Sequence, residues 1–260
     1  MQNTVESWLR QLHEERGSDL FVTADAPPCI KVNGKIRGLT TEVLLPDEVE
    51  EIIAGVMNER QREEYDTTQE CQFAISLEGD VRFRVSAFYQ QGMQGMVCRR
   101  IETKIPTTQE LDLPDVLNDL AMEKRGIILF VGATGTGKST SLAAMMGYRN
   151  RNSSGHIITI EDPIEYVHFH DKSIMTQREV GVDTESFEVA LKNTLRQAPD
   201  VIMIGEVRTR ETMEHAITFS ETGHLVLCTL HANNANQALD RILHFFPEDI
   251  QEKVLLDLSF

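Results

Sequence analysis

A glycine-rich stretch after a short apolar run restricts the possible folds of this chain more than any other feature. Residues 132–139 read Gly-Ala-Thr-Gly-Thr-Gly-Lys-Ser and match the pattern GxxxxGK[ST]. They come directly after the apolar run Ile127–Val131 and directly before Leu142, Ala143 and Met146, which recur at helical spacing. A strand, a glycine-rich loop and a helix in this order predict a phosphate-binding loop.

The chemistry of the loop follows from its residue types. Glycines let backbone N–H groups close around phosphate oxygens, and the N-terminus of the following helix adds the positive end of its dipole. Lys138 is expected to contact the β- and γ-phosphates of ATP, and Ser139 to bind Mg²⁺. A glycine-rich turn that binds no ligand is the alternative. The predicted nucleotide-binding residues are Gly132, Ala133, Thr134, Gly135, Thr136, Gly137, Lys138, Ser139 and Thr140.

The second half of the chain has the pattern of an α/β fold. From Gly126 onwards, continuous apolar runs are separated by helical segments, as expected for strands buried on both faces of a parallel sheet. We therefore expect residues 125–260 to form a nucleotide-binding core. The apolar runs are Ile127–Val131, Ile157–Ile160, Val201–Ile204 and Leu225–Leu230.

One of these runs ends in an acidic residue that is a candidate for the metal site. Residues 200–205 lead directly into Glu206, as a Walker B strand leads into its acid. Ligands bind at the carboxyl edge of open α/β sheets, so Glu206 is expected to order the Mg²⁺ shell together with Ser139. The alternative is an ordinary strand end whose carboxylate faces water.

The first half of the chain has the pattern of a separate, smaller α+β domain. We expect this domain to cover residues 1–103, and a linker at 104–124, where Pro106 and Pro114 interrupt any long element. The expected elements are helices at Val5–Leu12 and Pro46–Val56, hairpin turns at Asn33–Gly34 and Glu78–Asp80, and a last strand at Met96–Ile101.

Charge and cysteine spacing exclude several classes of function. The 41 acidic and 25 basic residues give a net charge of -16, which disfavours binding to nucleic acid. The four cysteines form no CxxC pair, which argues against a zinc or redox site and fits a reduced cytoplasm. Residues 1–7 do not resemble a secretory signal, and no apolar run approaches the roughly 20 residues of a membrane span. The apolar stretch Leu255–Phe260 does not look like a natural tail, so we expect further chain after it.

Four further segments carry a resemblance to the secretion and pilus ATPases. Ile160–Tyr166, Gln177–Gly181, Glu221–His224 and Thr229–Ala232 resemble the Asp box, the QRE segment and the His box of that superfamily. In the first half, Ser18–Phe21 and the pair Pro27-Pro28 are similar to the PAS-like N-terminal domain of those motors. The resemblance covers most of the chain. It implies a RecA-like P-loop ATPase core of the α/β class with a smaller α+β, PAS-like domain before it.

Within the superfamily, the chain resembles the retraction ATPases of type IV pili, the PilT/PilU group. Its N-terminal domain is short, and the tetracysteine insertion of extension and secretion motors is missing. Phe21 stands where PilT-like sequences usually have His, and Leu195–Asp200 and His231–Asn236 are similar to the PilU pattern. The AIRNLIRE motif of PilT-type motors would lie beyond the last residue of the sequence.

This resemblance implies a homo-hexameric ATP motor for pilus retraction and twitching motility. Its implied partners are a PilT-like retraction ATPase and a pilus platform protein of the inner membrane, at which a cytoplasmic motor would bind peripherally. Two alternatives remain at this stage. One is an accessory ring that binds ATP weakly and couples another motor to the pilus base, and the other is an extension or secretion ATPase.

The resemblance also implies roles for single residues of the ATPase half. Glu165 matches the catalytic glutamate that orients or deprotonates the attacking water, although an acid in such a loop is otherwise more often a solvated charge. His224 and His231 bracket the run Leu225–Leu230, where each could sense the γ-phosphate or a neighbouring subunit. Structural histidines are the alternative, and neither has a partner at metal-ligand spacing.

Four arginines complete the set of candidates. Arg84 and Arg99 lie in neighbouring strands of the first domain, and in the superfamily two arginines at matching places reach the nucleotide of the adjoining subunit. The alternative is that both pair with surface acids. Arg196 and Arg208 flank the strand before Glu206, and we expect surface or salt-bridge roles for them.

Overall fold

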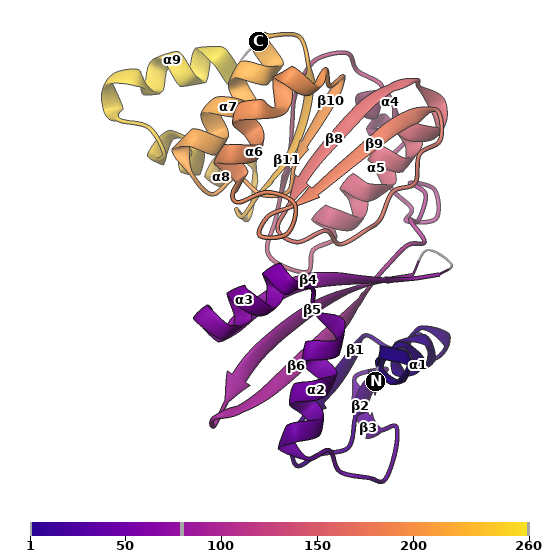
Figure 1. The fold of residues 1–260 in the computed structure, drawn as a ribbon. Helices are drawn as coiled ribbons and strands as arrows, with labels where there is room; N and C mark the ends of the chain where they lie inside the picture. Colours follow the sequence, from indigo (N-terminus) through magenta and orange to yellow (C-terminus); the bar gives the residue numbers. More distant parts are fainter. Residues whose placement is uncertain (1, 79–80, 259–260) are drawn as a thin grey trace. The chain divides into compact units, whose positions relative to one another are not determined.

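The computed structural model describes residues 2–78 and 81–258. The chain divides into two compact units, Met1–Thr103 and Lys104–Phe260, each of which has its own hydrophobic core (Figure 1). Gly79 and Asp80 of the predicted hairpin turn, and the last two residues of the apolar end, lie outside the described residues.

The first unit is an antiparallel sheet covered on one face by helices, with the strand order β3-β2-β1-β6-β5-β4. Alternation along β5 buries Phe83 and Val85 against the helices and turns Arg82 and Arg84 to the other face. The strands are β1 (Asp19–Thr23), β2 (Cys29–Val32), β3 (Lys35–Gly38), β4 (Glu70–Leu77), β5 (Val81–Gln90) and β6 (Met93–Ile101), and the helices are α1 (Gln2–Glu14), α2 (Pro46–Val56) and α3 (Glu59–Thr68).

Helix α3 has no counterpart in the sequence prediction. Its residues are nearly all polar, and only Tyr65 is buried, so no apolar periodicity marks it. Its start is nevertheless specified locally, because Asn58 accepts from the backbone N–H of Gln61 and the Gln61 side chain accepts from the backbone N–H of Asn58. This reciprocal capping box is the signal that would have revealed the helix.

The second unit is a parallel five-stranded sheet with helices on both faces, in the strand order β7-β11-β10-β8-β9. Helices α4 and α5 pack on one face, and α6, α7, α8 and α9 gather over the other (Figure 1). The strands are β7 (Gly126–Val131), β8 (Gly155–Glu161), β9 (Ser173–Glu179), β10 (Val201–Ile204) and β11 (Leu225–Leu230). The helices are α4 (Val116–Ala121), α5 (Lys138–Asn152), α6 (Phe187–Thr194), η1 (Leu195–Gln197), α7 (Arg210–Glu221), α8 (Ala235–His244) and α9 (Glu248–Leu258).

The four apolar runs of the sequence form four of these strands, β7, β8, β10 and β11. The fifth strand, β9, was not predicted because its sequence SIMTQRE contains no continuous apolar run. All five strands point the same way, so their carboxyl ends lie along one edge. That edge carries the ends of β7, β8, β10 and β11 and the residues that follow them.

The segment expected to be a linker belongs to the second unit and contains α4. Arg149, which is 8% exposed on α5, donates from Nη1 to the carbonyl oxygens of Ala121 and Glu123 at 2.7 Å each. These bonds satisfy carbonyls at the end of α4 that have no partner within the helix. Residues 104–124 are therefore packed on the helix that follows the phosphate loop.

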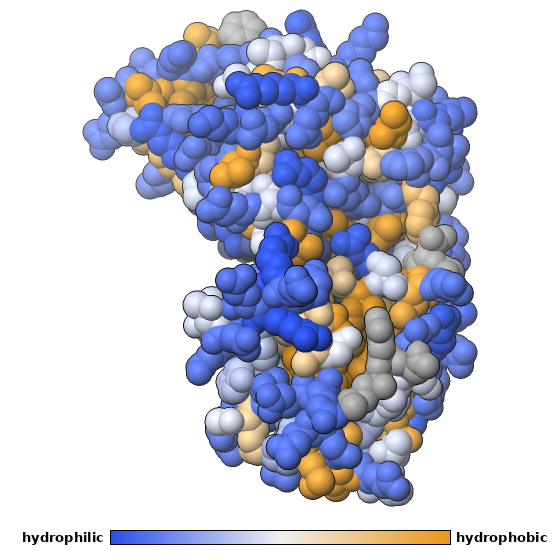
Figure 2. Space-filling view, in the orientation of Figure 1, coloured by the Kyte–Doolittle hydropathy of each residue, from blue (hydrophilic) through white to orange (hydrophobic). Residues whose placement is uncertain are grey.

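The surface in Figure 2 is largely hydrophilic, as expected for a chain with a quarter of its residues charged. Hydrophobic residues gather at the upper left, where Figure 1 draws α9, and Leu255 and Leu256 are exposed there. Among the helices of residues 2–78 and 81–258, none is long and apolar enough to cross a membrane.

Candidate active site

A pocket of about 580 Å³ lies at the carboxyl edge of the parallel sheet. Its walls come from the glycine-rich loop, the start of α5, the loop after β8, and the ends of β10 and β11. The predicted residues that line it are Thr134, Gly135, Gly137, Lys138, Ser139, Thr140, Glu165, Glu206 and His231, and Gly132, Ala133 and Thr136 line a smaller pocket beside it. The structure therefore brings the predicted phosphate loop and both predicted catalytic acids to one place.

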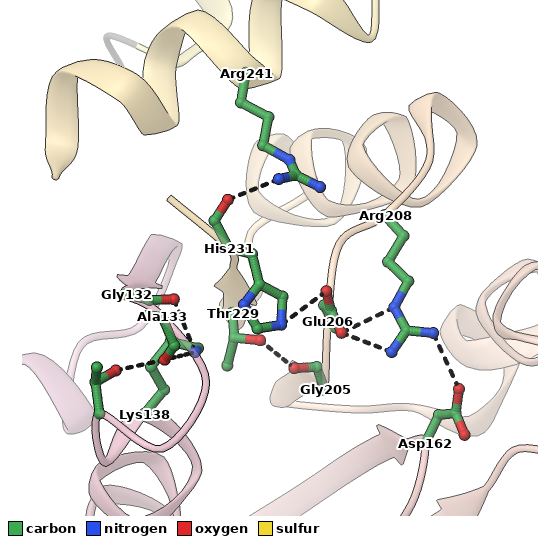
Figure 3. Close-up of polar contacts among 11 residues, drawn as sticks. Gly132, Ala133, Lys138, Asp162, Gly205, Glu206, Arg208, Thr229, His231 and Arg241 are labelled. Carbon is green, nitrogen blue, oxygen red and sulfur yellow. Dashed lines mark hydrogen bonds and ion pairs between the residues drawn. The ribbon is translucent and has the colours of Figure 1, made fainter. Parts of the chain in front are cut away.

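The phosphate loop has the backbone shape that its glycines permit. Gly135 and Gly137 have φ angles of +79° and +88°, a region that disfavours residues with a Cβ. Helix α5 begins at Lys138, directly after Gly137. The Nζ atom of Lys138 donates to the carbonyl oxygens of Gly132 at 2.9 Å and Ala133 at 2.8 Å (Figure 3). The ammonium group thus lies over the loop, next to the N-terminus of the helix, where an anion is favoured.

Glu206 follows β10 and is the centre of a polar cluster (Figure 3). Its Oε2 accepts from Arg208 Nε at 2.8 Å, and its Oε1 lies 3.2 Å from His231 Nε2. Arg208 also lies 3.4 Å from Asp162 Oδ2, so one guanidinium joins the ends of β8 and β10. The hydrogen bond to Glu206 raises the pKa of Arg208, which keeps the guanidinium charged. Arg208 thus forms the expected salt bridges, and it forms them with two acids that line the pocket.

The two candidate histidines lie at opposite ends of β11, and only His231 reaches the pocket. His224 precedes the strand, with Nδ1 3.1 Å from the carbonyl oxygen of Phe219 and 3.2 Å from the Thr222 hydroxyl. A six-residue strand is about 20 Å long. The strand therefore places His224 at the amino edge of the sheet, away from this pocket, and its role in sensing the γ-phosphate or a neighbouring subunit stays a prediction.

The loop that carries Glu165 is tied to β9 by side chains of the QRE segment. Glu179 is 2% exposed, and its Oε2 accepts from the backbone N–H of Ile164 at 3.1 Å. Gln177 donates from Nε2 to the carbonyl oxygen of Tyr166 at 2.9 Å and accepts from the backbone N–H of His168 at 2.6 Å. The sequence marked this segment only as part of a family resemblance, and the structure shows what its side chains contact.

Two further residues of this region were not singled out from the sequence. Glu161, at the end of β8, is 8% exposed, and burial raises the pKa of its carboxyl to about 7. Burial also lowers the pKa of His168 to about 4, so this imidazole in the pocket wall is neutral. The signal for Glu161 was the run Ile157–Ile160, which leads directly into an acid, much as the run Val201–Ile204 leads through Gly205 into Glu206.

The two candidate arginines of the first unit lie directly opposite each other in the β5–β6 ladder, on the face of the sheet away from the core. Arg99 donates from Nε to Oδ1 of Asp19 at 2.8 Å, and Asp19 is buried. Arg99 is thus paired with a buried acid and not with a surface acid, and neither the finger role nor the surface-acid alternative is decided. For Arg84, no ion pair is recorded within residues 2–78 and 81–258. Arg196 lies exposed in η1.

The chain matches the type II/IV secretion system protein family over residues 1–254. It is 66% identical over 254 residues to the type IV pilus ATPase PilU of Pseudomonas aeruginosa, covering 98% of this chain and 66% of that protein. It is 42% identical over 246 residues to the type IV pilus retraction ATPase PilT of the same organism, covering 95% of this chain and 72% of that protein. The chain thus spans about two-thirds of the PilU relative.

Among solved structures, a crystal structure of the pilus retraction motor PilT with bound ADP matches the chain with a TM-score of 0.91. The two are 44% identical, and the match covers 97% of this chain and 74% of that one. This match confirms the predicted fold class, an ATPase core of the RecA-like type with a smaller N-terminal domain.

Proposed function

Because the chain belongs to the type II/IV secretion system protein family, we propose that it is an ATP-hydrolysing motor that drives the retraction of type IV pili. One observation carries this proposal. The phosphate loop with Lys138 lines the same pocket as two acids, Glu165 from the loop after β8 and Glu206 from the end of β10. A nucleotide held by the loop would present its γ-phosphate to both carboxylates, as ATP hydrolysis requires.

The nucleotide is ATP, bound by its phosphates to residues 132–140. The Lys138 ammonium would exchange the two loop carbonyls that it contacts now for the β- and γ-phosphates. Mg²⁺ fits the donor set of the pocket, because the Ser139 hydroxyl and the Glu206 carboxylate both line it and both supply oxygen atoms. Mg²⁺ is usually held by one or two such groups together with phosphate oxygens and water. When bound, the ion neutralises the charge that develops on the phosphates.

In ATP hydrolysis, Glu165 and Glu206 are proposed to have different roles. Glu165 orients the water that attacks the γ-phosphate, and its loop is held by buried bonds to β9 so that the carboxylate enters the pocket in one place. Glu206 orders the Mg²⁺ shell, and His231 and Arg208 hold its two oxygens. His231 links this acid to the end of β11 and is the better placed of the two histidines to respond to the state of the γ-phosphate.

A motor that pulls on a pilus is proposed to act as an assembly of several subunits. We propose a homo-hexamer in which Arg84 and Arg99 of one subunit reach the nucleotide of the next. In this hexamer, His224 would contact a neighbouring subunit. The ring would act from the cytoplasm, bound peripherally at the inner membrane to a pilus platform protein, and together with a PilT-like ATPase. PilU and PilT of Pseudomonas aeruginosa are both type IV pilus ATPases by name, which supports this group of partners.

The proposal is tested by the release of inorganic phosphate from ATP by the purified protein, with Mg²⁺ present and with Lys138→Ala as the matched control. Steady phosphate release that the variant lacks is expected. ATP binding without phosphate release, with and without a PilT-like partner, would contradict hydrolysis and would indicate the accessory ring instead.

A further inference from the structure

Besides Glu165, Glu206 and the Asp162 carboxylate that pairs with Arg208, the nucleotide pocket contains a buried carboxyl group to which the proposed mechanism gives no task. Glu161 is the last residue of β8, lines the pocket and is 8% exposed. A carboxyl group at that depth is costly unless it is hydrogen-bonded. The partners of Glu161 therefore indicate what its burial achieves.

Two donors bond the Glu161 carboxyl from neighbouring strands. The Thr159 hydroxyl on β8 donates to Oε1 at 2.6 Å, and Nε2 of Gln177 on β9 donates to the same oxygen at 3.1 Å. The same Nε2 of Gln177 also donates to the carbonyl oxygen of Tyr166 at 2.9 Å. Glu161 is thus linked, through the Gln177 amide, to the residue next to the proposed catalytic glutamate.

The loop is held at successive residues around this contact. Glu179 accepts from the backbone N–H of Ile164, and Gln177 donates to the carbonyl oxygen of Tyr166. The Tyr166 hydroxyl lies 3.1 Å from Oγ1 of Thr140 in the first turn of α5. The main chain on both sides of Glu165 is therefore fixed to β9, and the Tyr166 side chain reaches α5. Glu161 supports this arrangement through its bond with Gln177.

We propose that Glu161 is a positioning residue, which fixes the direction in which the Glu165 side chain enters the pocket by holding the Gln177 amide that bonds the main chain of the Glu165 loop. The inference rests on the proposed function, because it acts through the catalytic task of Glu165. Displacement of a reacting group by 1 Å can cost about 100-fold in rate. Loss of this contact should therefore lower kcat far more than it changes KM for ATP, since the phosphate loop that binds ATP is untouched.

A double-mutant cycle on the full-length protein separates this role from a merely structural one. Glu161→Gln keeps the shape of the side chain and replaces the carboxylate acceptor by an amide, and we expect kcat to fall about 10- to 100-fold with KM within about twofold. In a Glu165→Gln background, the same change should cause little further loss, because the residue it positions no longer acts. Losses that multiply in the double variant would overturn the proposal, as would wild-type kcat for Glu161→Gln.

Two further variants serve as a control and as an alternative to Glu161→Gln. Ser173→Ala removes a buried hydrogen bond, from Ser173 Oγ to the carbonyl oxygen of Ser153 at 2.6 Å, at the other end of β9, and should leave kcat unchanged. Thr159→Val removes one donor to Glu161 while keeping its shape. It replaces Glu161→Gln if that variant fails to fold, and it should lower kcat only where Glu165 is intact.

The outcomes also separate this inference from the proposed function. If Glu165→Gln hydrolyses ATP at the wild-type rate, the catalytic assignment of Glu165 is wrong, and the positioning role falls with it. If Glu165→Gln is slow and Glu161→Gln is as fast as wild type, only the positioning role is wrong.

Discussion

The burial of Glu161 makes the stability of the second unit depend on pH. Burial raises the pKa of this carboxyl from its ordinary 4.5 to about 7, so between these values the folded chain holds a proton that the unfolded chain has lost. Stability must then fall as pH rises through this window and level off above it. Each pKa unit is worth about 1.36 kcal/mol, so the free energy of unfolding is expected to fall by about 3 kcal/mol between about pH 4.5 and pH 7.5.

The assay compares wild type with Glu161→Gln, which has no proton to exchange at this site. Denaturant unfolding of the second unit is followed at several pH values. Only the difference in the free energy of unfolding between wild type and variant is compared, so that the contributions of the other titrating groups cancel. Wild type should lose about 3 kcal/mol relative to the variant across the window. A difference that stays constant with pH would refute the argument, because the carboxyl would then titrate alike in the folded and the unfolded chain.

The remaining predictions concern the nucleotide site. Lys138→Ala should abolish tight Mg-ATP binding in a fluorescence assay and leave the first unit folded, because it removes the main point charge on the phosphates; unchanged affinity would refute the phosphate-loop assignment. Glu165→Gln and Glu206→Gln should bind ATP but release phosphate at least about 100-fold more slowly, and wild-type turnover in either would refute its role. Mixing Arg84→Ala/Arg99→Ala subunits with Lys138→Ala subunits should restore some ATPase activity, and proven mixed rings without recovery at any ratio would count against fingers that act across the interface.

Features encoded locally in the sequence were predicted well. The phosphate loop is specified by residues 132–139 alone. A strand buried on both faces must be continuously apolar, so β8, β10 and β11 are visible as runs, and the half-buried edge strand β7 is apolar enough to be visible too. Glu206, predicted from the end of one such run, lies at the carboxyl edge of the sheet, and Glu161, at the end of another, lies there too but was not singled out. For Glu165, a loop acid, the family resemblance carried the prediction, and its presence in the pocket agrees with it.

Features that depend on which elements become neighbours were not predictable. Gln177 lies in an edge strand without apolar periodicity, and its bonds to the Glu165 loop exist only because β9 pairs with β8. Arg208 was recognised as a salt-bridge candidate, but its two partners come from different strand ends. The sequence places His224 and His231 symmetrically about one strand, and only the direction of that strand in the sheet shows that His231 is the one that lines the pocket.

The most direct test of the central claim is the number of surface pili in a strain deleted for this gene and complemented with wild-type protein or with Glu165→Gln at equal expression. The PilT-like partner is present in both strains. If ATP hydrolysis in this pocket drives retraction, wild type should restore retraction, and the variant should leave pili accumulated on the surface. Full restoration by Glu165→Gln would contradict the claim, because the protein would then support retraction without turning over ATP.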